Sequence, residues 1–230
     1  MLREPRALLF DLDDTLHPRR RFVISGLRAV AAHAAARHGI ATSAAAGVLA
    51  RALRHRPGHE LQALQEALAL PPEVITTWIG VLRAHVPALR LSAATRDVLT
   101  RLRADWRLGL VTNGLADVQA RKVAALDLPA LVEAIVYATA DGRPGKPAAA
   151  PFLEACTRLA VTPARTVFVG DDLAADIAGA AAVGMKTIWL APPDRRGAGG
   201  PYADITVHTI ADVPAAARRL LPSWWSPYAA

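Results

Sequence analysis

Near its N-terminus the chain reads Leu8-Leu9-Phe10-Asp11-Leu12-Asp13-Asp14-Thr15-Leu16. The apolar run fits one buried strand, although its length also allows the start of a buried helix. Three carboxylates follow within four residues, and at the end of a buried strand they are costly unless a cation compensates them. Asp11 and Asp13 are two residues apart, so an extended strand places both on one side. Such a pair can bind Mg²⁺ while one carboxylate attacks an electrophile; the alternative is an acidic turn that caps the next helix.

Three later stretches complete the pattern: Val111-Thr112-Asn113-Gly114, Gly145-Lys146-Pro147 and Val167-Phe168-Val169-Gly170-Asp171-Asp172-Leu173-Ala174-Ala175-Asp176. The first and the last of them again place polar residues directly after an apolar run. Taken together and in this order, the four stretches resemble the motifs of the haloacid dehalogenase (HAD) superfamily, whose members are mostly phosphatases. The resemblance covers nearly the whole chain.

From about residue 93 the sequence alternates between helical and strand patterns. Apolar runs predict five strands in this part, at 108–111, 134–137, 166–169, 187–190 and 205–207. Strands that alternate with helices favour a parallel α/β sheet, and ligands of such sheets bind beyond the C-terminal ends of the strands. The motifs lie at such ends. We therefore predict the α/β class, with a Rossmann-like parallel sheet as the core.

Residues 17–87 differ from the rest of the chain because no strand is evident in them. Apolar residues recur at helical spacing, as in Val23, Leu27 and Val30, and Thr42-Ser43 is predicted to cap a further helix. We therefore predict a helical insertion at 17–87 and an α/β catalytic core formed by residues 1–16 and 88–230. In the HAD superfamily an insertion at this point is a C1 cap, which closes over the active site.

The composition limits the partners and the compartment. A net charge of +7 raises nucleic acid as a partner, but the basic residues are scattered along predicted helices, and no aromatic residues interleave with Arg19-Arg20-Arg21. No apolar run reaches the roughly 18 residues that span a membrane, and no signal-peptide pattern is found. Cys156 is the only cysteine, so no intrachain disulfide is possible. We expect a cytoplasmic protein without a nucleic-acid or membrane partner.

The resemblance to the HAD superfamily implies roles for the carboxylates. Asp11 would be the nucleophile and Asp13 the general acid and base. Mg²⁺ would be held by the Asp11 carboxylate, the Asp13 backbone carbonyl and the Asp171 carboxylate, because oxygen ligands suit this ion. Asp172 and Asp176 would contact these metal ligands without binding the ion themselves. The alternative for both residues is capping of a helix N-terminus, where acidic side chains are favoured.

Four further residues would bind the phosphoryl group, namely Thr112, Asn113, Gly114 and Lys146. Thr112 offers a hydroxyl, and Asn113-Gly114 offer backbone N–H groups; Gly114 lets the backbone come close. An ordinary turn between a strand and a helix is the alternative for this stretch. Lys146, one of only three lysines, would bind the phosphoryl group and offset the carboxylates, with a surface lysine in a loop as the alternative.

The function predicted from these features is Mg²⁺-dependent hydrolysis of a small phosphorylated metabolite, of the sugar phosphate or nucleotide monophosphate class. The dehalogenases of the superfamily lack the aspartate two residues after the nucleophile, so Asp13 favours phosphoryl transfer. A phosphomutase of the same superfamily and a non-catalytic phospho-acceptor or binding protein are the alternatives. Trp224-Trp225 could pack on the core or support a dimer contact, and the chain is predicted to be a monomer or a homodimer.

Overall fold

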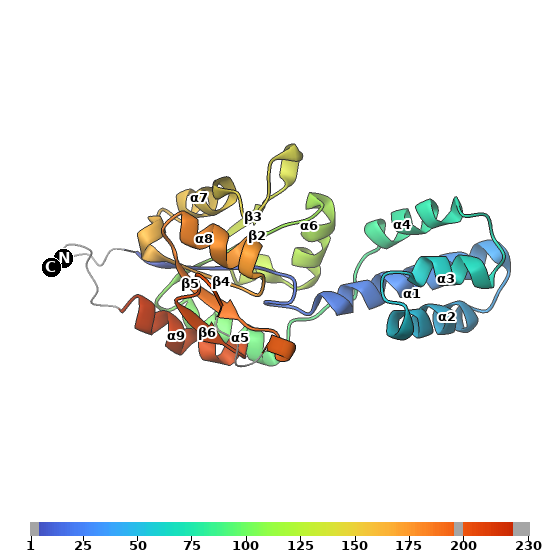
Figure 1. Cartoon of the computed structure of the whole chain (residues 1–230), viewed down its shortest axis with the longest axis horizontal. Coiled ribbons are helices and arrows are strands. Elements are labelled where there is room, and N and C mark those ends of the chain that lie inside the picture. Colours follow the sequence, from blue (N-terminus) through green and yellow to red (C-terminus); the bar gives the residue numbers. More distant parts are fainter. Residues whose placement is uncertain (1–4, 196–199, 223–230) are drawn as a thin grey trace. The chain divides into compact units, whose positions relative to one another are not determined.

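The computed structural model describes residues 5–195 and 200–222, and the Trp224-Trp225 pair lies outside them. The chain divides into two compact units. Met1–Pro18 and Arg90–Ala230 form the first, which we call the α/β unit, and Arg19–Leu89 form the second, which we call the helical unit. Both units are drawn in Figure 1. Among the described residues, no helix is both long and apolar enough to cross a membrane.

The α/β unit contains one parallel sheet, whose strand order is β3-β2-β1-β4-β5-β6 within the described residues. The strands are β1 (Ala7–Phe10), β2 (Arg107–Thr112), β3 (Ala134–Tyr137), β4 (Thr166–Gly170), β5 (Lys186–Leu190) and β6 (Ile205–Val207). Strand β1 pairs with β2 on one side and β4 on the other, so that Leu9 lies opposite both Gly109 and Phe168. All residues of β1 and β4 are buried, as expected for strands covered on both faces.

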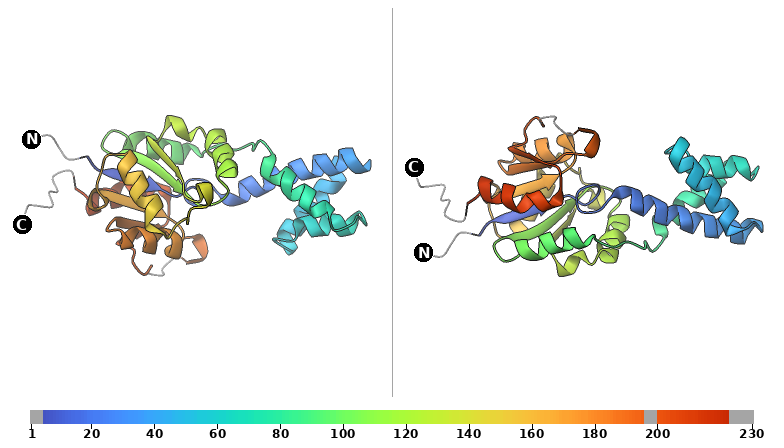
Figure 2. Two further views of the ribbon diagram at one scale, coloured as in Figure 1. Left: turned by 90° about the horizontal axis from the view of Figure 1, so that it is seen from above. Right: turned by 90° about the horizontal axis from the view of Figure 1, so that it is seen from below.

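Helices cover both faces of this sheet. They are α5 (Ala93–Leu102), α6 (Ala116–Ala125), α7 (Ala149–Arg158), α8 (Gly179–Ala182) and α9 (Val213–Leu220). Helices α7 and α8 lie on one face and α5 and α9 on the other (Figures 1 and 2). Phe152 of α7 packs edge-on against Phe168 of β4, with the ring centroids 5.0 Å apart. Short 3₁₀ turns occur in the connections, namely η1 (Leu128–Ala130), η2 (Ala140–Gly142), η3 (Pro163–Arg165), η5 (Pro193–Arg195) and η6 (Ile210–Asp212).

The helical unit is built from α1 (Arg19–His38), α2 (Thr42–His55), α3 (Glu60–Ala67) and α4 (Val74–Ala84). Its core is a cluster of buried side chains from all four helices that includes Leu27, Leu49, Leu64 and Trp78. The predicted cap of α2 is wrong. The helix already begins at Thr42, so Ala41 occupies the N-cap position, and no side chain caps the helix there. The parallel sheet and the inserted helical region together confirm the predicted fold class.

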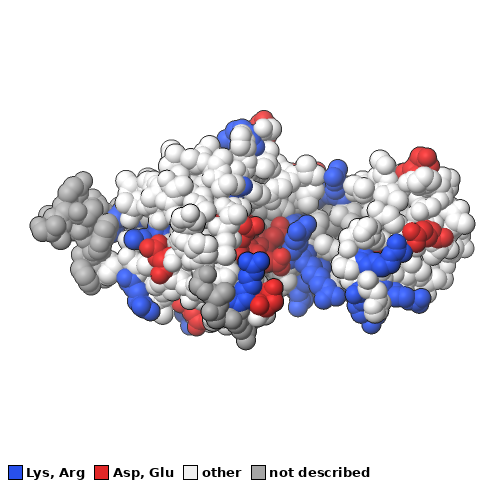
Figure 3. Space-filling model, in the orientation of Figure 1, with Lys and Arg blue, Asp and Glu red and all other residues white. Residues whose placement is uncertain are grey.

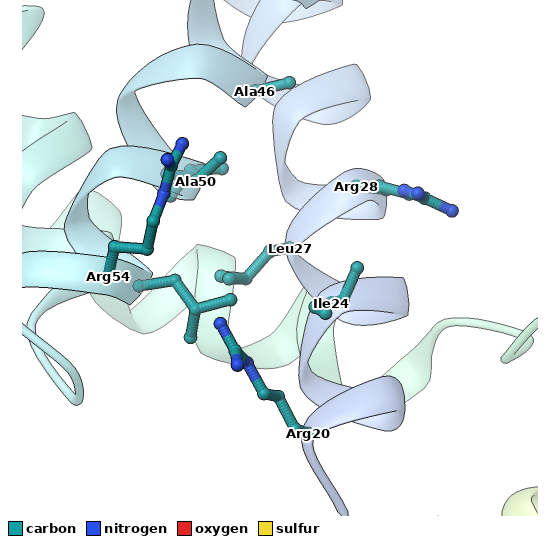
Figure 4. Close-up of a pocket in the computed structure, with 9 residues that line it drawn as sticks. Arg20, Ile24, Leu27, Arg28, Ala46, Ala50 and Arg54 are labelled. Atoms are coloured by element: carbon teal, nitrogen blue, oxygen red, sulfur yellow. The ribbon is translucent and has the colours of Figure 1, made fainter.

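A groove of about 290 Å³ lies between α1 and α2 of the helical unit (Figure 4). Its floor is apolar, with Leu27 and Leu49 among the lining residues, and Arg20, Arg28 and Arg54 line it as well. Arg20 extends into the space between the two helices, Arg54 lies along α2, and Arg28 points away from α2. Basic side chains also gather over the α1 and α2 side of this unit in Figure 3. The groove therefore combines apolar surface with an excess of positive charge.

Candidate active site

The predicted site residues meet at the C-terminal edge of the sheet. Asp11 follows β1 directly, Asp171 follows β4, and Thr112 is the last residue of β2. These three strands are neighbours, and the strand order changes direction between β1 and β4. A crevice beyond the strand ends at such a point is where open parallel α/β sheets bind ligands. The topology thus brings together residues that are up to 160 positions apart in the chain, as the strand pattern predicted.

Three carboxylates form the centre of the site. One oxygen each from Asp11, Asp171 and Asp176 lies within 4.8 Å of the others. The Lys146 ammonium lies between two of them, 2.6 Å from Asp11 Oδ1 and 2.6 Å from Asp176 Oδ1. It also donates to the backbone carbonyl of Val111 at 2.9 Å. Its side chain is only 2% exposed, so Lys146 is a buried partner of the carboxylates rather than a surface lysine.

The electrostatics of the cluster reflect a deficit of positive charge. Burial raises the pKa of Asp11 to about 7, against the opposing effect of Lys146 and with further help from the neighbouring carboxylate of Asp176. Burial, together with Asp176 and Asp14, likewise raises the pKa of Asp171 to about 6. Burial alone would lower the pKa of Lys146, but Asp11 and Asp176 raise it above its ordinary value. One ammonium therefore does not balance three carboxylates, and a divalent cation fits this donor set.

Asp176 reaches the cluster through an unusual turn after β4. Residues Leu173–Ala178 form a π-helical turn (η4). The turn brings the Asp176 carboxylate back over Gly170 so closely that a side chain at Gly170 would collide with it. The backbone N–H of Asp172 donates to Asp176 Oδ2 at 3.2 Å. Asp176 is thus a full member of the carboxylate cluster and not only its support.

Asp172 lies outside the cluster. Its side chain accepts hydrogen bonds from the backbone N–H groups of Ala174 and Ala175, both at 2.8 Å, and so caps η4. Of the two interpretations of Asp172, this geometry favours capping. Thr15, which the sequence analysis did not single out, donates its hydroxyl proton to Asp171 Oδ1 at 3.3 Å.

The stretches after β2 and before α7 are joined to each other by Asn113. Its side-chain amide donates to the Lys146 carbonyl and accepts from the Lys146 backbone N–H, both at 2.9 Å. The sequence pattern predicted only a backbone role for Asn113, so this pair of side-chain hydrogen bonds was not foreseen. Through these two hydrogen bonds Asn113 fixes where the backbone of the Lys146 loop lies.

Gly114 has a φ of 118°, which side-chain-bearing residues rarely adopt, so a glycine is required at this turn.

Asp13 has partners that the sequence analysis did not predict. The Lys122 ammonium contacts both of its carboxylate oxygens, at 2.9 and 2.7 Å. Gln119 Nε2 donates to Asp13 Oδ2 at 3.2 Å and to the Thr112 hydroxyl at 2.5 Å. Both residues lie on α6 and are buried. The available signal was the identity of Lys122, because only three of the 27 lysine and arginine residues are lysines.

A sequence profile described as haloacid dehalogenase-like hydrolase matches residues 5–184 of this chain. The chain belongs to the haloacid dehalogenase-like hydrolases. Glyceraldehyde 3-phosphate phosphatase from Methanopyrus kandleri is 31% identical to this HAD-like hydrolase over 221 residues, which are 91% of each chain. The predicted superfamily and the predicted enzyme class, a phosphatase, are thereby confirmed.

Solved structures agree with this membership. The crystal structure of a HAD phosphatase from Thermococcus onnurineus matches with a TM-score of 0.60 and 26% identity, covering 95% of this chain and 98% of that one. The HAD hydrolase YfnB from Bacillus subtilis, in a crystal form bound to magnesium, matches with a TM-score of 0.67 over 93% of this chain and 99% of that one. At 20% identity the second match is a likeness of fold.

Proposed function

We propose that this protein is a Mg²⁺-dependent phosphatase that hydrolyses a small phosphorylated metabolite through a phosphoenzyme on Asp11. The observation that carries the proposal is the cluster of Asp11, Asp171 and Asp176, with the buried Lys146 ammonium between two of its members and Asp13 on the same loop as Asp11. An anionic nucleophile, a partner for proton transfer and an excess of carboxylates for a cation are what phosphoryl transfer requires. The phosphatase name of the M. kandleri relative supports the same reaction class.

The reaction would take two steps, formation of the phosphoenzyme and its hydrolysis. An Asp11 carboxylate oxygen forms a bond to phosphorus while the bond to the alcohol oxygen breaks, and Asp13 gives that oxygen a proton. Asp13 then removes a proton from water, which attacks phosphorus, releases phosphate and restores Asp11. Thr112 and the backbone N–H groups of Asn113 and Gly114 would bind the phosphoryl oxygens. Lys146 would hold Asp11 in place and offset charge in the first and second steps.

The donor set indicates how a metal ion would be held. Asp11, Asp171 and the backbone carbonyl of Asp13 would bind Mg²⁺, and the position of Asp176 makes it a further candidate. When bound, the ion supplies positive charge that neutralises the phosphoryl group and favours the ionised form of the carboxylates. The fit rests on the three carboxylate oxygens that lie within 4.8 Å of one another with a single ammonium beside them. The raised pKa values of Asp11 and Asp171 support it.

The substrate class is proposed from two features. The M. kandleri relative is named for a triose phosphate, which supports a sugar phosphate or similar small metabolite here, with a nucleotide monophosphate as the other member of the proposed class. The helical unit is proposed to act as the substrate-selecting cap. Its groove between α1 and α2 offers apolar surface beside the cationic side chains of Arg20 and Arg54.

Release of inorganic phosphate from a panel of phosphomonoesters tests the proposal. We expect turnover with Mg²⁺ and none after removal of divalent cations with EDTA, restored on adding Mg²⁺ back. Asp11→Asn should be inactive, whereas Asp97→Asn, at an exposed position on α5, should match the unmodified protein. Full activity in EDTA would refute the metal dependence. An isomerised substrate without released phosphate would indicate a phosphomutase instead.

A further inference from the structure

The side chains of Gln119 and Lys122, which we call the α6 clamp, contact two predicted catalytic residues that come from different strands. Lys122 binds both oxygens of Asp13, and Gln119 uses its one amide nitrogen to reach Asp13 and Thr112 together. Because the two residues are three positions apart on α6, they lie on one face of the helix. The clamp thus ties the loop after β1 to the end of β2.

Burial distinguishes this contact from the ordinary ion pairs on the protein surface. The Lys122 side chain is 7% exposed and that of Asp13 is 23% exposed, whereas Lys186 and its partner Asp204 are 47% and 29% exposed. Burying a lysine costs desolvation energy that a surface pair avoids, so stability alone is a weak reason for placing Lys122 here.

The choice of lysine also points to a local requirement. This chain uses arginine for nearly all of its basic residues, yet both buried lysines contact a predicted catalytic carboxylate, Lys146 on Asp11 and Lys122 on Asp13. An ammonium is a compact charge with donors that rotate, and a guanidinium is a wider, planar fork that does not replace it in a tight site. Each of the two aspartates therefore has its own lysine.

We propose that Gln119 and Lys122 are positioning residues, which fix the Asp13 carboxylate and the Thr112 hydroxyl for phosphoryl transfer. The inference rests on the proposed function above. Lys122 holds both carboxylate oxygens and so sets where Asp13 meets the leaving group. Gln119 donates to the Thr112 oxygen, so the hydroxyl acts as a donor toward its other neighbours. Its proton is directed at the Asn113 carbonyl at 3.5 Å, a long hydrogen bond that a phosphoryl oxygen would replace. Neither clamp residue needs to touch the substrate.

A misplaced Asp13 has an effect that depends on the leaving group. An alkoxide leaves only with the help of a proton, while 4-nitrophenolate leaves without one. Loss of the clamp should therefore slow the hydrolysis of alkyl phosphates much more than that of 4-nitrophenyl phosphate. A residue that only stabilises the fold would reduce both rates by the same factor, since less folded enzyme would be present.

The test compares kcat on an alkyl phosphate and on 4-nitrophenyl phosphate, under saturating Mg²⁺, for K122M, Q119M and the control K186M. We expect K122M to lose about 100-fold on the alkyl phosphate and only a few-fold on the aryl phosphate, within the usual range for general acid–base catalysis. Q119M should shift the ratio in the same direction by about 10-fold, and K186M should leave it unchanged.

Each outcome decides the inference. Equal losses on both substrates, or no loss on either, in folded K122M would overturn it. If K122M does not fold, judged by circular dichroism, the ratio in Q119M decides, because Q119M leaves the ion pair intact. If the unmodified protein hydrolyses no phosphomonoester, the proposed function fails first; if it is active and the ratio does not move, only the positioning role fails.

Discussion

At the C-terminal edge of the sheet three carboxylates lie together and only two of them contact the buried Lys146 ammonium, whereas the groove between α1 and α2 has arginines and no acidic partner for them among the described residues. The first region has too little positive charge and the second too much. A surplus of one sign indicates the sign of the ligand that is expected there. The edge of the sheet therefore suits a cation, and the groove suits an anion that carries some apolar surface.

Removing the Lys146 ammonium from the carboxylate cluster should have the largest effect on stability. Lys146→Met leaves Asp11 and Asp176 without their partner, which should cost about 3–5 kcal/mol of unfolding free energy at pH 8. At pH 5.5 the carboxyls take up protons, so the loss should be smaller. Denaturant unfolding of the metal-free protein at both pH values measures it. The exposed control Lys186→Met should cost less than about 1 kcal/mol, and equal losses in the two variants would contradict this account.

Adding the missing cation should stabilise the protein in a pH-dependent way. The pKa values of Asp11, about 7, and Asp171, about 6, lie above the ordinary 3.8. Without metal, protonation of these carboxyls therefore stabilises the folded state fully below pH 3.8, and this contribution is lost as the pH rises through 6 and 7. Because protons compete with metal, Mg²⁺ should raise Tm by about 5 °C at pH 8 and by less at pH 5.5.

A matched pair of variants sharpens the assignment of the metal ligands. Asp171→Asn should lose most of the Mg²⁺-dependent shift in Tm, because Asp171 belongs to the carboxylate cluster. Asp172→Asn should keep that shift, because the Asp172 side chain caps η4 instead. A shift that disappears in Asp172→Asn and persists in Asp171→Asn would reverse the assignment.

The smallest expected effect is in the groove. Arg54→Glu should raise the KM for substrates that carry a second anionic group by roughly 5- to 10-fold, since one exposed charge pair is worth about 1 kcal/mol. The KM for 4-nitrophenyl phosphate should stay the same. Arg51→Glu makes the same charge change on α2 outside the groove. If both variants raised KM equally, general electrostatics rather than the groove would account for it.

The same contrast explains what the sequence could predict. Asp11, Thr112 and Asp171 were found because each lies at the end of an apolar strand, and the ends of parallel strands meet at one edge. The roles of Gln119 and Lys122 were missed because the face that α6 turns toward Asp13 depends on how the helix packs, which local periodicity does not reveal. In the helical unit, spacing predicted helices but not the groove between them.

Asp176 illustrates a different limit. The sequence placed it before a helix, where an acidic side chain is expected as a cap, and the local pattern does not distinguish a π-helical turn from an α-helix. The wider turn brings the carboxylate over Gly170 and into contact with Lys146. The glycine before the aspartate pair was visible in the sequence, but its purpose depends on a side chain six residues later.

The most direct test of the account is the fate of the phosphoryl group in Asp13→Asn. With 4-nitrophenyl phosphate the first step should still occur, because this leaving group departs without a proton, and the phosphoenzyme should persist because the base that activates water is missing. Mass spectrometry after rapid quench should find a phosphate adduct on the peptide that contains Asp11. In Asp11→Asn both the adduct and turnover should be absent. An adduct on another peptide, or full activity in Asp11→Asn, would contradict the assignment of Asp11 as the nucleophile.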